Sequence, residues 1–216
     1  MLADPRLAAA LARHYRAPAL GAAHPWLARA QSVSFMGTAP SSDVRPFRGP
    51  KDTLQRMAQH ALGPRGEQSA LVRQFTEWVI RDVHPKDYLG EILAIRNVFV
   101  QWSPTRPTAP LFRYTNDPRH VEMIKDPQRI VEEIAEQGTS LVDCDDSAQM
   151  AGTMLMQIGR EVEFVAMGFE PNSLSHVAVR AREPKSGKMI ILDGVAGPRE
   201  AEAAGKAKEL LIWSLN

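Results

Sequence analysis

The chain contains a single cysteine, Cys144, among its 216 residues. One cysteine cannot form a disulfide within the chain, so a disulfide framework is excluded and the redox compartment stays open. No apolar run approaches the roughly 18 residues that a membrane-spanning helix needs, so we expect no membrane partner. The segment Met1–Pro5 lacks a basic stretch followed by an apolar one, and we therefore expect no secretory signal.

The chain also lacks an excess of charge of either sign, because its formal net charge is +1. A nucleic-acid partner would require a basic footprint, so we expect none. Hydrophobic residues make up 44% of the chain, which is enough for a buried core. The length suits one domain with an extension, or two small units.

Residues 1–50 differ in composition from the rest of the chain. They are rich in alanine and proline and hold too few large apolar residues for a core of their own, and residues 36–50 form a predicted loop. We interpret residues 1–50 as an N-terminal arm that packs on a partner or on the main domain, which comprises residues 51–216. Near the other end, residues 199–210 are typical of a surface helix, and the apolar tail 211–213 docks on the core or forms a final strand.

Apolar spacing and helix-ending residues predict an α+β domain. Helices are predicted over residues 52–62, 67–83 and 87–100, the last of which could become a strand near its end. The pairs Asp117-Pro118 and Asp126-Pro127 each predict a helix start, because Asp suits the N-cap and Pro the first helical position. A helix from Cys144 ends at Gly159, and strand-like runs follow at 162–169, 175–182 and 188–193, the last two as a hairpin.

Cys144, His176 and Asp193 are the candidate catalytic residues. Cys144 stands at the predicted helix start, where the unpaired backbone N–H groups and the helix dipole favour the thiolate, the reactive form of cysteine. The same N–H groups can accept the oxyanion of a tetrahedral intermediate, and we also considered Gln101 or Trp102 for that role. His176 lies in one strand of the hairpin and Asp193 closes the other, where its carboxylate can hold the imidazole. The alternative is a small buried cysteine in a protein that only binds a partner.

The hairpin register decides whether His176 and Asp193 share a sheet face. A loop over residues 183–186 pairs Arg182 with Gly187 and places His176 directly opposite Asp193. A loop one residue shorter or longer puts the two side chains on opposite faces, unless a bulge corrects it. Both registers remain open from the sequence.

Three aspartates surround the cysteine: Asp143, Asp145 and Asp146. They suit a helix N-terminus, with Asp143 as the cap and Asp146 three residues on. Their negative charge opposes formation of a thiolate beside them. They could also hold a divalent cation, but they lack the spacing of an EF-hand, and we expect neither a metal nor another cofactor.

The run Asp143-Cys144-Asp145-Asp146, the helix to Gly159, His176-Val177 and Leu192-Asp193 resemble the transglutaminase-like superfamily, in versions encoded by tailed bacteriophages. The resemblance covers residues 111–194. It implies a papain-like α+β core in which the cysteine helix packs on an antiparallel sheet. It also implies attack on an amide bond through a thioester, by a cysteine peptidase, amidase or acyltransferase.

Two functions follow as hypotheses. The first is a thiol hydrolase or acyltransferase that uses the triad on a peptide or peptidoglycan-type amide. The second is a virion structural or assembly protein on the same fold, with a vestigial triad, which contacts other virion proteins through the N-terminal arm and the C-terminal tail. The resemblance places the protein in the host cytoplasm or in the phage virion.

Overall fold

The computed structural model describes residues 42–100, 111–118, 121–195 and 204–215. Most of the predicted arm, together with Gln101 and Trp102, lies outside these residues. The helices are α3 (Pro50–Leu62), α4 (Ala70–Ile80), α5 (Tyr88–Val100), α6 (Pro127–Gln137) and α7 (Cys144–Gln157). The strands are β1 (Ser42–Pro46), β2 (Phe112–Tyr114), β3 (Val121–Lys125), β4 (Ser140–Val142), β5 (Val162–Gly168), β6 (His176–Arg182), β7 (Met189–Leu192) and β8 (Glu209–Ser214).

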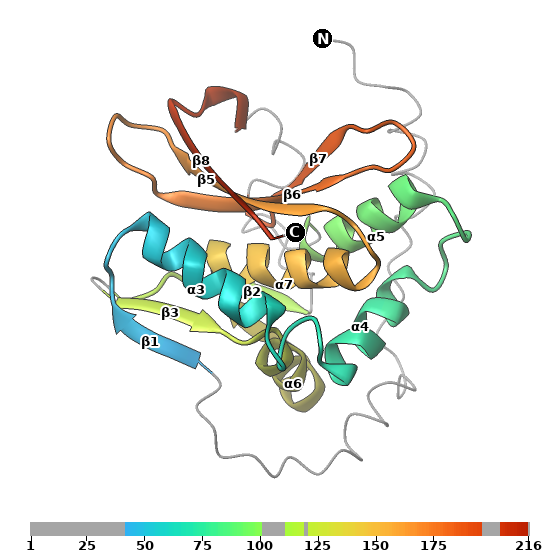
Figure 1. Ribbon diagram of the computed structural model, residues 1–216. Helices are drawn as coiled ribbons and strands as arrows, with labels where there is room; N and C mark the ends of the chain where they lie inside the picture. Colours follow the sequence, from blue (N-terminus) through green and yellow to red (C-terminus); the bar gives the residue numbers. More distant parts are fainter. Residues whose placement is uncertain (1–41, 101–110, 119–120, 196–203, 216) are drawn as a thin grey trace.

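The largest sheet has four strands in the order β7-β6-β5-β8, with every neighbouring pair antiparallel. Two smaller sheets have two strands each: β1 pairs with β3 in antiparallel fashion, and β2 pairs with β4 in parallel. Figure 1 shows the four-stranded sheet above α7, with α3 and α5 beside that helix and α6 below it. The fold is therefore of the α+β class, as predicted.

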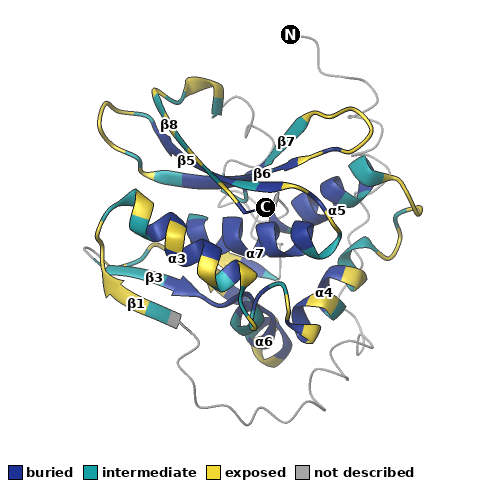
Figure 2. Ribbon diagram, in the orientation of Figure 1, coloured by how far each residue is buried: buried dark blue, intermediate teal, exposed yellow. Residues whose placement is uncertain are grey.

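Helix α7 forms the centre of the molecule. Its residues from Asp145 to Met156 are all buried, and Figure 2 shows it enclosed between the sheet and the other helices. Gly152 permits a close approach to the sheet, because a Cβ added there would lie 3.0 Å from Cε1 of Phe164 on β5. The sheet and the surrounding helices thus hold α7, and with it the cysteine at its first position.

Several predicted helix ends are confirmed. Asp126 is the N-cap of α6 with a proline following it, and Gly138 ends that helix in the left-handed conformation (φ 77°). The Asp126 carboxylate makes no capping bond, however, because it binds His60 and Arg65 at 2.6 and 3.1 Å. Helix α5 continues to Val100, so the helical alternative for residues 87–100 is correct.

Other expectations are wrong. The predicted loop over residues 36–50 contains strand β1, which gains its hydrogen bonds from β3, a partner about 80 residues away in the sequence. The pair Asp117-Pro118 does not start a helix: the Asp117 carboxylate accepts a hydrogen bond from Met123 N of β3 at 2.5 Å. Of the helix predicted over residues 199–210, residues 199–203 lie outside the described residues, only 204–206 are helical, and β8 begins at Glu209. The alternative of a final strand for the tail is confirmed.

No helix among the described residues is both long and apolar enough to cross a membrane. The division into an arm and a domain at residue 50 stays a prediction, because residues 1–41 are not described. Residues 42–50 do contact the rest of the fold, through the β1–β3 pairing and through the start of α3.

Candidate active site

The cysteine stands where a strand passes directly into a helix. Strand β4 ends at Val142, Asp143 caps α7 by accepting a hydrogen bond from Asp146 N at 3.2 Å, and Cys144 is the first helical residue. The thiol is the only one in the chain and its residue is partly exposed. The predicted place of Cys144 and the predicted cap are both confirmed.

His176 and Asp193 are in direct contact. Nε2 of His176 lies 2.6 Å from Oδ2 of Asp193, whose other oxygen accepts a hydrogen bond from Val195 N at 2.8 Å. Asp193 is 2% exposed, so its carboxylate is fixed inside the protein. Since Nε2 of His176 is hydrogen-bonded to Asp193, the other ring nitrogen, Nδ1, is the one left to interact with the Cys144 thiol.

The hairpin reaches this contact in a register two residues away from the predicted one. Arg182 pairs with Met189, not with Gly187, and the loop comprises residues 184–187. The side chain of Glu183 accepts hydrogen bonds from Lys185 N and Ser186 N, which moves the turn one residue along the chain. A shift by two residues preserves the sheet face, so His176 and Asp193 still share it as diagonal neighbours.

The electrostatic surroundings keep His176 protonated. Burial alone lowers the pKa of His176, but hydrogen bonds and charges from Asp193 and Cys144 outweigh it and raise that pKa to about 10. At neutral pH the ring is therefore an imidazolium held between the carboxylate and the sulfur. The ring of Phe169 lies 6.4 Å from the imidazole, centroid to centroid, and is tilted by 33° relative to it.

The aspartates beside the cysteine carry less charge than their number indicates. Burial raises the pKa of Asp143 to about 7, and burial together with the neighbouring Asp143 raises the pKa of Asp146 well above its ordinary value. Asp143 is therefore partly neutral near pH 7, and Asp146 holds its proton to a higher pH than an exposed aspartate does. This reduces the repulsion that the sequence predicted against a thiolate at Cys144.

The cysteine and the histidine line one cleft of about 200 Å³. Its walls come from the first turns of α3 and the segment before it, from β3 and the segment before it, from the start of α7, and from the β5–β6 side of the sheet. The lining residues are Phe47, Pro50, Thr53, Leu54, Asp117, Glu122, Asp143, Cys144, Asp145, Ala166, Leu174, Ser175, His176 and Val177. Asp193 lies behind His176, in the position of a residue that orients the ring.

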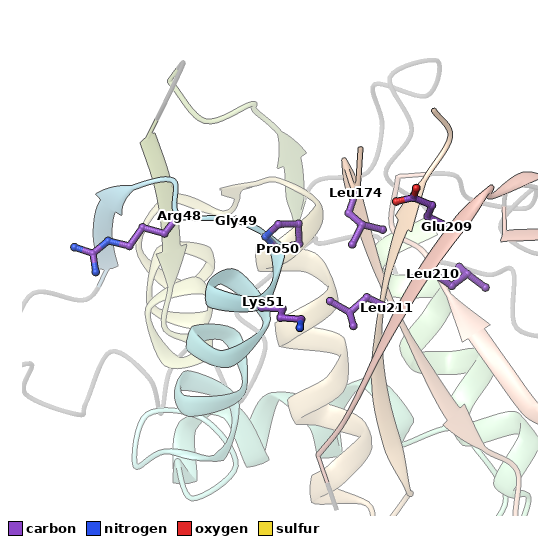
Figure 3. Close-up of a pocket in the computed structure, with 8 residues that line it drawn as sticks. All are labelled: Arg48, Gly49, Pro50, Lys51, Leu174, Glu209, Leu210 and Leu211. Carbon is purple, nitrogen blue, oxygen red and sulfur yellow. The ribbon is translucent and has the colours of Figure 1, made fainter. Parts of the chain in front are cut away.

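A second, more open depression of about 650 Å³ adjoins this cleft, with which it shares Pro50 and Leu174. Figure 3 shows Leu174 and Leu211 near Pro50 across the depression, while the Arg48 side chain extends away from it. Strand β8, at the edge of the sheet, supplies the far wall through residues 209–211. An extended substrate bound at Cys144 would therefore have an apolar surface to continue along.

Sequence reasoning missed three polar residues of the site. Asp117 and Glu122 line the cleft from β3 and from the segment before it, and only the β1–β3 pairing brings them there. Tyr114, at the end of β2, stands beside Val142 in the parallel pair. Burial, with Cys144 and Asp143 nearby adding to its effect, raises the pKa of Tyr114 to about 12, so its hydroxyl remains a hydrogen-bond donor. No local motif marks these three positions.

No protein-family model matches the chain, and no curated protein matches its sequence. Two solved structures are similar. One is described as a "putative protease" from Parabacteroides distasonis, with a TM-score of 0.48, 15% identity, and coverage of 76% of this chain and 28% of that chain. The other is described as a "putative cysteine protease" from Cytophaga hutchinsonii, with a TM-score of 0.41, 15% identity, and coverage of 81% of this chain and 63% of that chain. This chain therefore spans less than two thirds of the length of either protein.

Proposed function

We propose that the protein is a thiol hydrolase or acyltransferase that attacks an amide bond through a Cys144–His176–Asp193 triad, on a transglutaminase-like fold. One observation carries the proposal: His176 is held by Asp193 at 2.6 Å and also interacts with Cys144, the first residue of a buried helix. A cysteine that served only as a small core residue would need neither a charged histidine beside it nor a place in the wall of a cleft.

The resting site is then a thiolate–imidazolium pair. The Cys144 sulfur attacks the carbonyl carbon of the substrate, a C–S bond forms, and the carbonyl electrons move to oxygen. The first backbone N–H groups of a helix have no partner within it, and that of Asp146 is already used by the caps. This leaves the N–H groups of Cys144 and Asp145 as the nearest donors for the oxyanion.

Collapse of this intermediate breaks the C–N bond. His176 donates its proton to the leaving amine, which departs and leaves an acyl group on Cys144 as a thioester. Water or a second amine then attacks the thioester and gives its proton to His176, and Cys144 leaves as a thiolate. Asp193 keeps the ring oriented and stabilises its charged form throughout.

Acylation by 4-nitrophenyl acetate tests the proposal. The folded protein should acetylate Cys144, seen by intact mass, and release 4-nitrophenolate at a rate at least ~100-fold above that of His176→Ala, since a positioned acid–base group contributes about that much. Asp193→Asn should fall between the two. The protein unfolded in guanidinium provides the reactivity of the same thiol without the site. Equal acetylation of the folded and unfolded protein would contradict the proposal.

A further inference from the structure

Carboxylates dominate the cleft beside the cysteine. Asp117, Glu122, Asp143 and Asp145 all line it, and no Lys or Arg is among the described residues of its wall. Burial raises the pKa of Asp117 and the charges of Lys125 and Arg56 partly offset that rise, but the side chains of both cations make their ion pairs with carboxylates outside the cleft. Arg56 binds Asp43 at 2.8 Å, and Lys125 binds Glu133 at 3.2 Å. The one cationic group of this wall is His176, which Asp193 and Cys144 already hold, so the four carboxylates outnumber the positive charge among the described lining residues.

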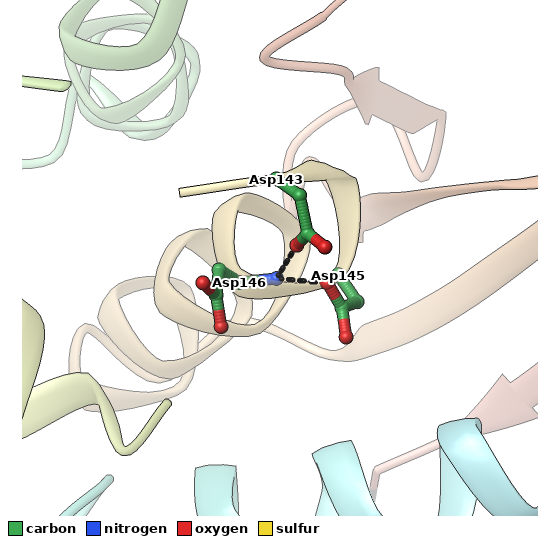
Figure 4. Close-up of side chains that lie close together, drawn as sticks. All are labelled: Asp143, Asp145 and Asp146. Atoms are coloured by element: carbon green, nitrogen blue, oxygen red, sulfur yellow. Dashed lines mark hydrogen bonds between the residues drawn. The ribbon is translucent and has the colours of Figure 1, made fainter. Parts of the chain in front are cut away.

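One of these carboxylates, that of Asp145, has an oxygen with no hydrogen-bond partner in the described part of the chain. Asp145 is only 3% exposed, and its Oδ1 accepts a hydrogen bond from Asp146 N at 2.9 Å. Its Oδ2 is buried and has no hydrogen-bond partner among the described residues. Figure 4 shows this carboxylate directed away from the helix start toward α3, whose residues Thr53 and Leu54 line the same cleft. A buried carboxylate oxygen without a donor is costly unless a ligand supplies one.

The other three carboxylates have structural hydrogen bonds and keep spare acceptor capacity. Asp117 accepts from Met123 N, Glu122 from the Thr53 hydroxyl at 2.9 Å, and Asp143 from Asp146 N. Burial raises the pKa of Asp117 and of Glu122, and mutual repulsion adds to the rise for Glu122. A bound cation would relieve that repulsion.

A primary ammonium fits this cleft better than a metal ion does. Asp143, Asp145 and Asp146 lie within 4.8 Å of one another because the first two share the backbone N–H of the third, as Figure 4 shows. The Asp146 carboxylate accepts a hydrogen bond from Lys125 N at 2.8 Å and is not part of the cleft wall. Ca²⁺ would need about six to eight oxygen ligands. An ammonium needs acceptors for only three N–H donors.

We propose that the acidic side of this cleft is a subsite for a protonated primary amine, with Asp145 as its main acceptor and Glu122 and Asp117 facing it. The substrate class is then an amide with an amino group close to the scissile carbonyl, such as a peptide with a free amino-terminus or a lysine side chain at that place. This assignment rests on the proposed function, since it takes Cys144 as the nucleophile. The cleft volume of about 200 Å³ suits one small group rather than a large ligand.

Methanethiosulfonate reagents of different charge test the subsite without an enzymatic substrate. The 2-aminoethyl reagent carries an ammonium, the methyl reagent is neutral, and both form a mixed disulfide with Cys144 by releasing methanesulfinate. The measured quantity is the ratio of the cationic to the neutral rate constant, divided by the same ratio for free cysteine. This double ratio cancels any change in the reactivity of the thiol itself. We expect at least a tenfold preference for the cation in the wild type.

The variants Asp145→Asn and Glu122→Gln keep their acceptor bonds to Asp146 N and to Thr53 while removing a charge. Each should lower the preference several-fold, and n-butylammonium should slow the cationic reagent in the wild type only. Asp82→Asn, at an exposed site two residues after the end of α4, is the matched control and should leave the preference unchanged.

A wild-type ratio equal to that of free cysteine, or one that the cleft variants lower no more than the control does, would overturn the subsite. These results are distinguishable from failure of the proposed function. A thiol that is not activated would react slowly with the neutral reagent, whatever its preference for charge.

Discussion

At the scale of single residues, the site depends on which groups are charged near pH 7. The pKa of His176 is raised to about 10 and that of Asp143 to about 7, one through its partners and the other through burial. The two shifts have the same consequence for stability. A group whose pKa is higher in the folded protein than in the unfolded chain binds a proton more tightly when folded, so its contribution weakens as the pH rises.

We expect the wild-type protein to unfold more easily at pH 8 than at pH 5. Asp143 in the unfolded chain ionises near its ordinary value of 3.8, whereas in the folded protein it must ionise in a buried place as the pH approaches about 7. Each pH unit in this window corresponds to about 1.4 kcal/mol, so Asp143 alone should lower the free energy of unfolding by about 2–3 kcal/mol between pH 5 and pH 8. Urea denaturation at the two pH values measures the difference.

Asp143→Asn is the matched variant, because asparagine is an equally good N-cap and cannot ionise. It should show a markedly smaller difference between the two pH values than the wild type. An identical pH dependence in both proteins would show that Asp143 does not ionise in this window.

The three residues of the proposed triad stand out in the sequence, and the other polar residues of the cleft do not. Cys144, His176 and Asp193 are each tied to a local signal: a lone cysteine at a helix start, a histidine in a strand, and an aspartate that ends an apolar run. Asp117 and Tyr114 have no such signal. They reach the site through pairing between strands that are distant in the sequence, which no local pattern specifies.

At the scale of elements, the cysteine helix and the sheet were predictable because their signals are local and strong. The ends of α7 and of strands β5–β7 agree with the sequence to within about two residues, whereas α4 is three residues shorter at each end than the predicted helix 67–83. The Asp-Pro signal failed once, at Asp117, because the Asp117 carboxylate accepts a hydrogen bond from Met123 N of β3 and does not cap a helix. The same type of dipeptide at Asp126 does precede a helix, so tertiary contacts decided between the two outcomes.

The contact between α7 and the sheet provides a prediction at this scale. Gly152→Val should destabilise the protein by about 1–3 kcal/mol, because its Cβ would stand 3.0 Å from the Phe164 ring, whose residue is fully buried. The loss should appear although valine has a higher helix propensity than glycine. Thermal and urea denaturation measure it.

Ala70→Val, at an exposed position of α4, provides the comparison and should cost less than about 1 kcal/mol. If Gly152→Val were as stable as the wild type, α7 would not pack against β5 as closely as the structure places it.

At the scale of the whole molecule, residues 42–50 belong to the folded unit. Strand β1 pairs with β3, and Asp43 on β1 forms an ion pair with Arg56 of α3, whose side chain is 4% exposed. The composition of residues 1–50 could not reveal this, because a short polar strand resembles a loop until its partner is known. The same pairing brings Phe47 and Pro50 to the wall of the cleft.

Asp43→Ala should therefore lower the free energy of unfolding by about 3 kcal/mol, since it leaves the Arg56 guanidinium buried without its main partner. Burial raises the pKa of Asp43, but hydrogen bonds and charges from Arg56 and Arg45 outweigh it, so the net pKa is lowered. The stability that ionised Asp43 provides is then present at neutral pH and is lost as the pH falls below about 4.

The control is Asp82→Ala, which removes an exposed partner of Arg81 and should cost less than about 1 kcal/mol. Equal losses in the two variants would mean that β1 is not an integral part of the fold.

The central claim is that Cys144 and His176 form a working pair, and the rate of Cys144 alkylation by iodoacetamide against pH tests it most directly. We expect the wild type to react at pH 6 much faster than an unperturbed thiol, and His176→Ala to lose this advantage. A cysteine that is inert, or that reacts like free cysteine in both proteins at every pH, would contradict the account.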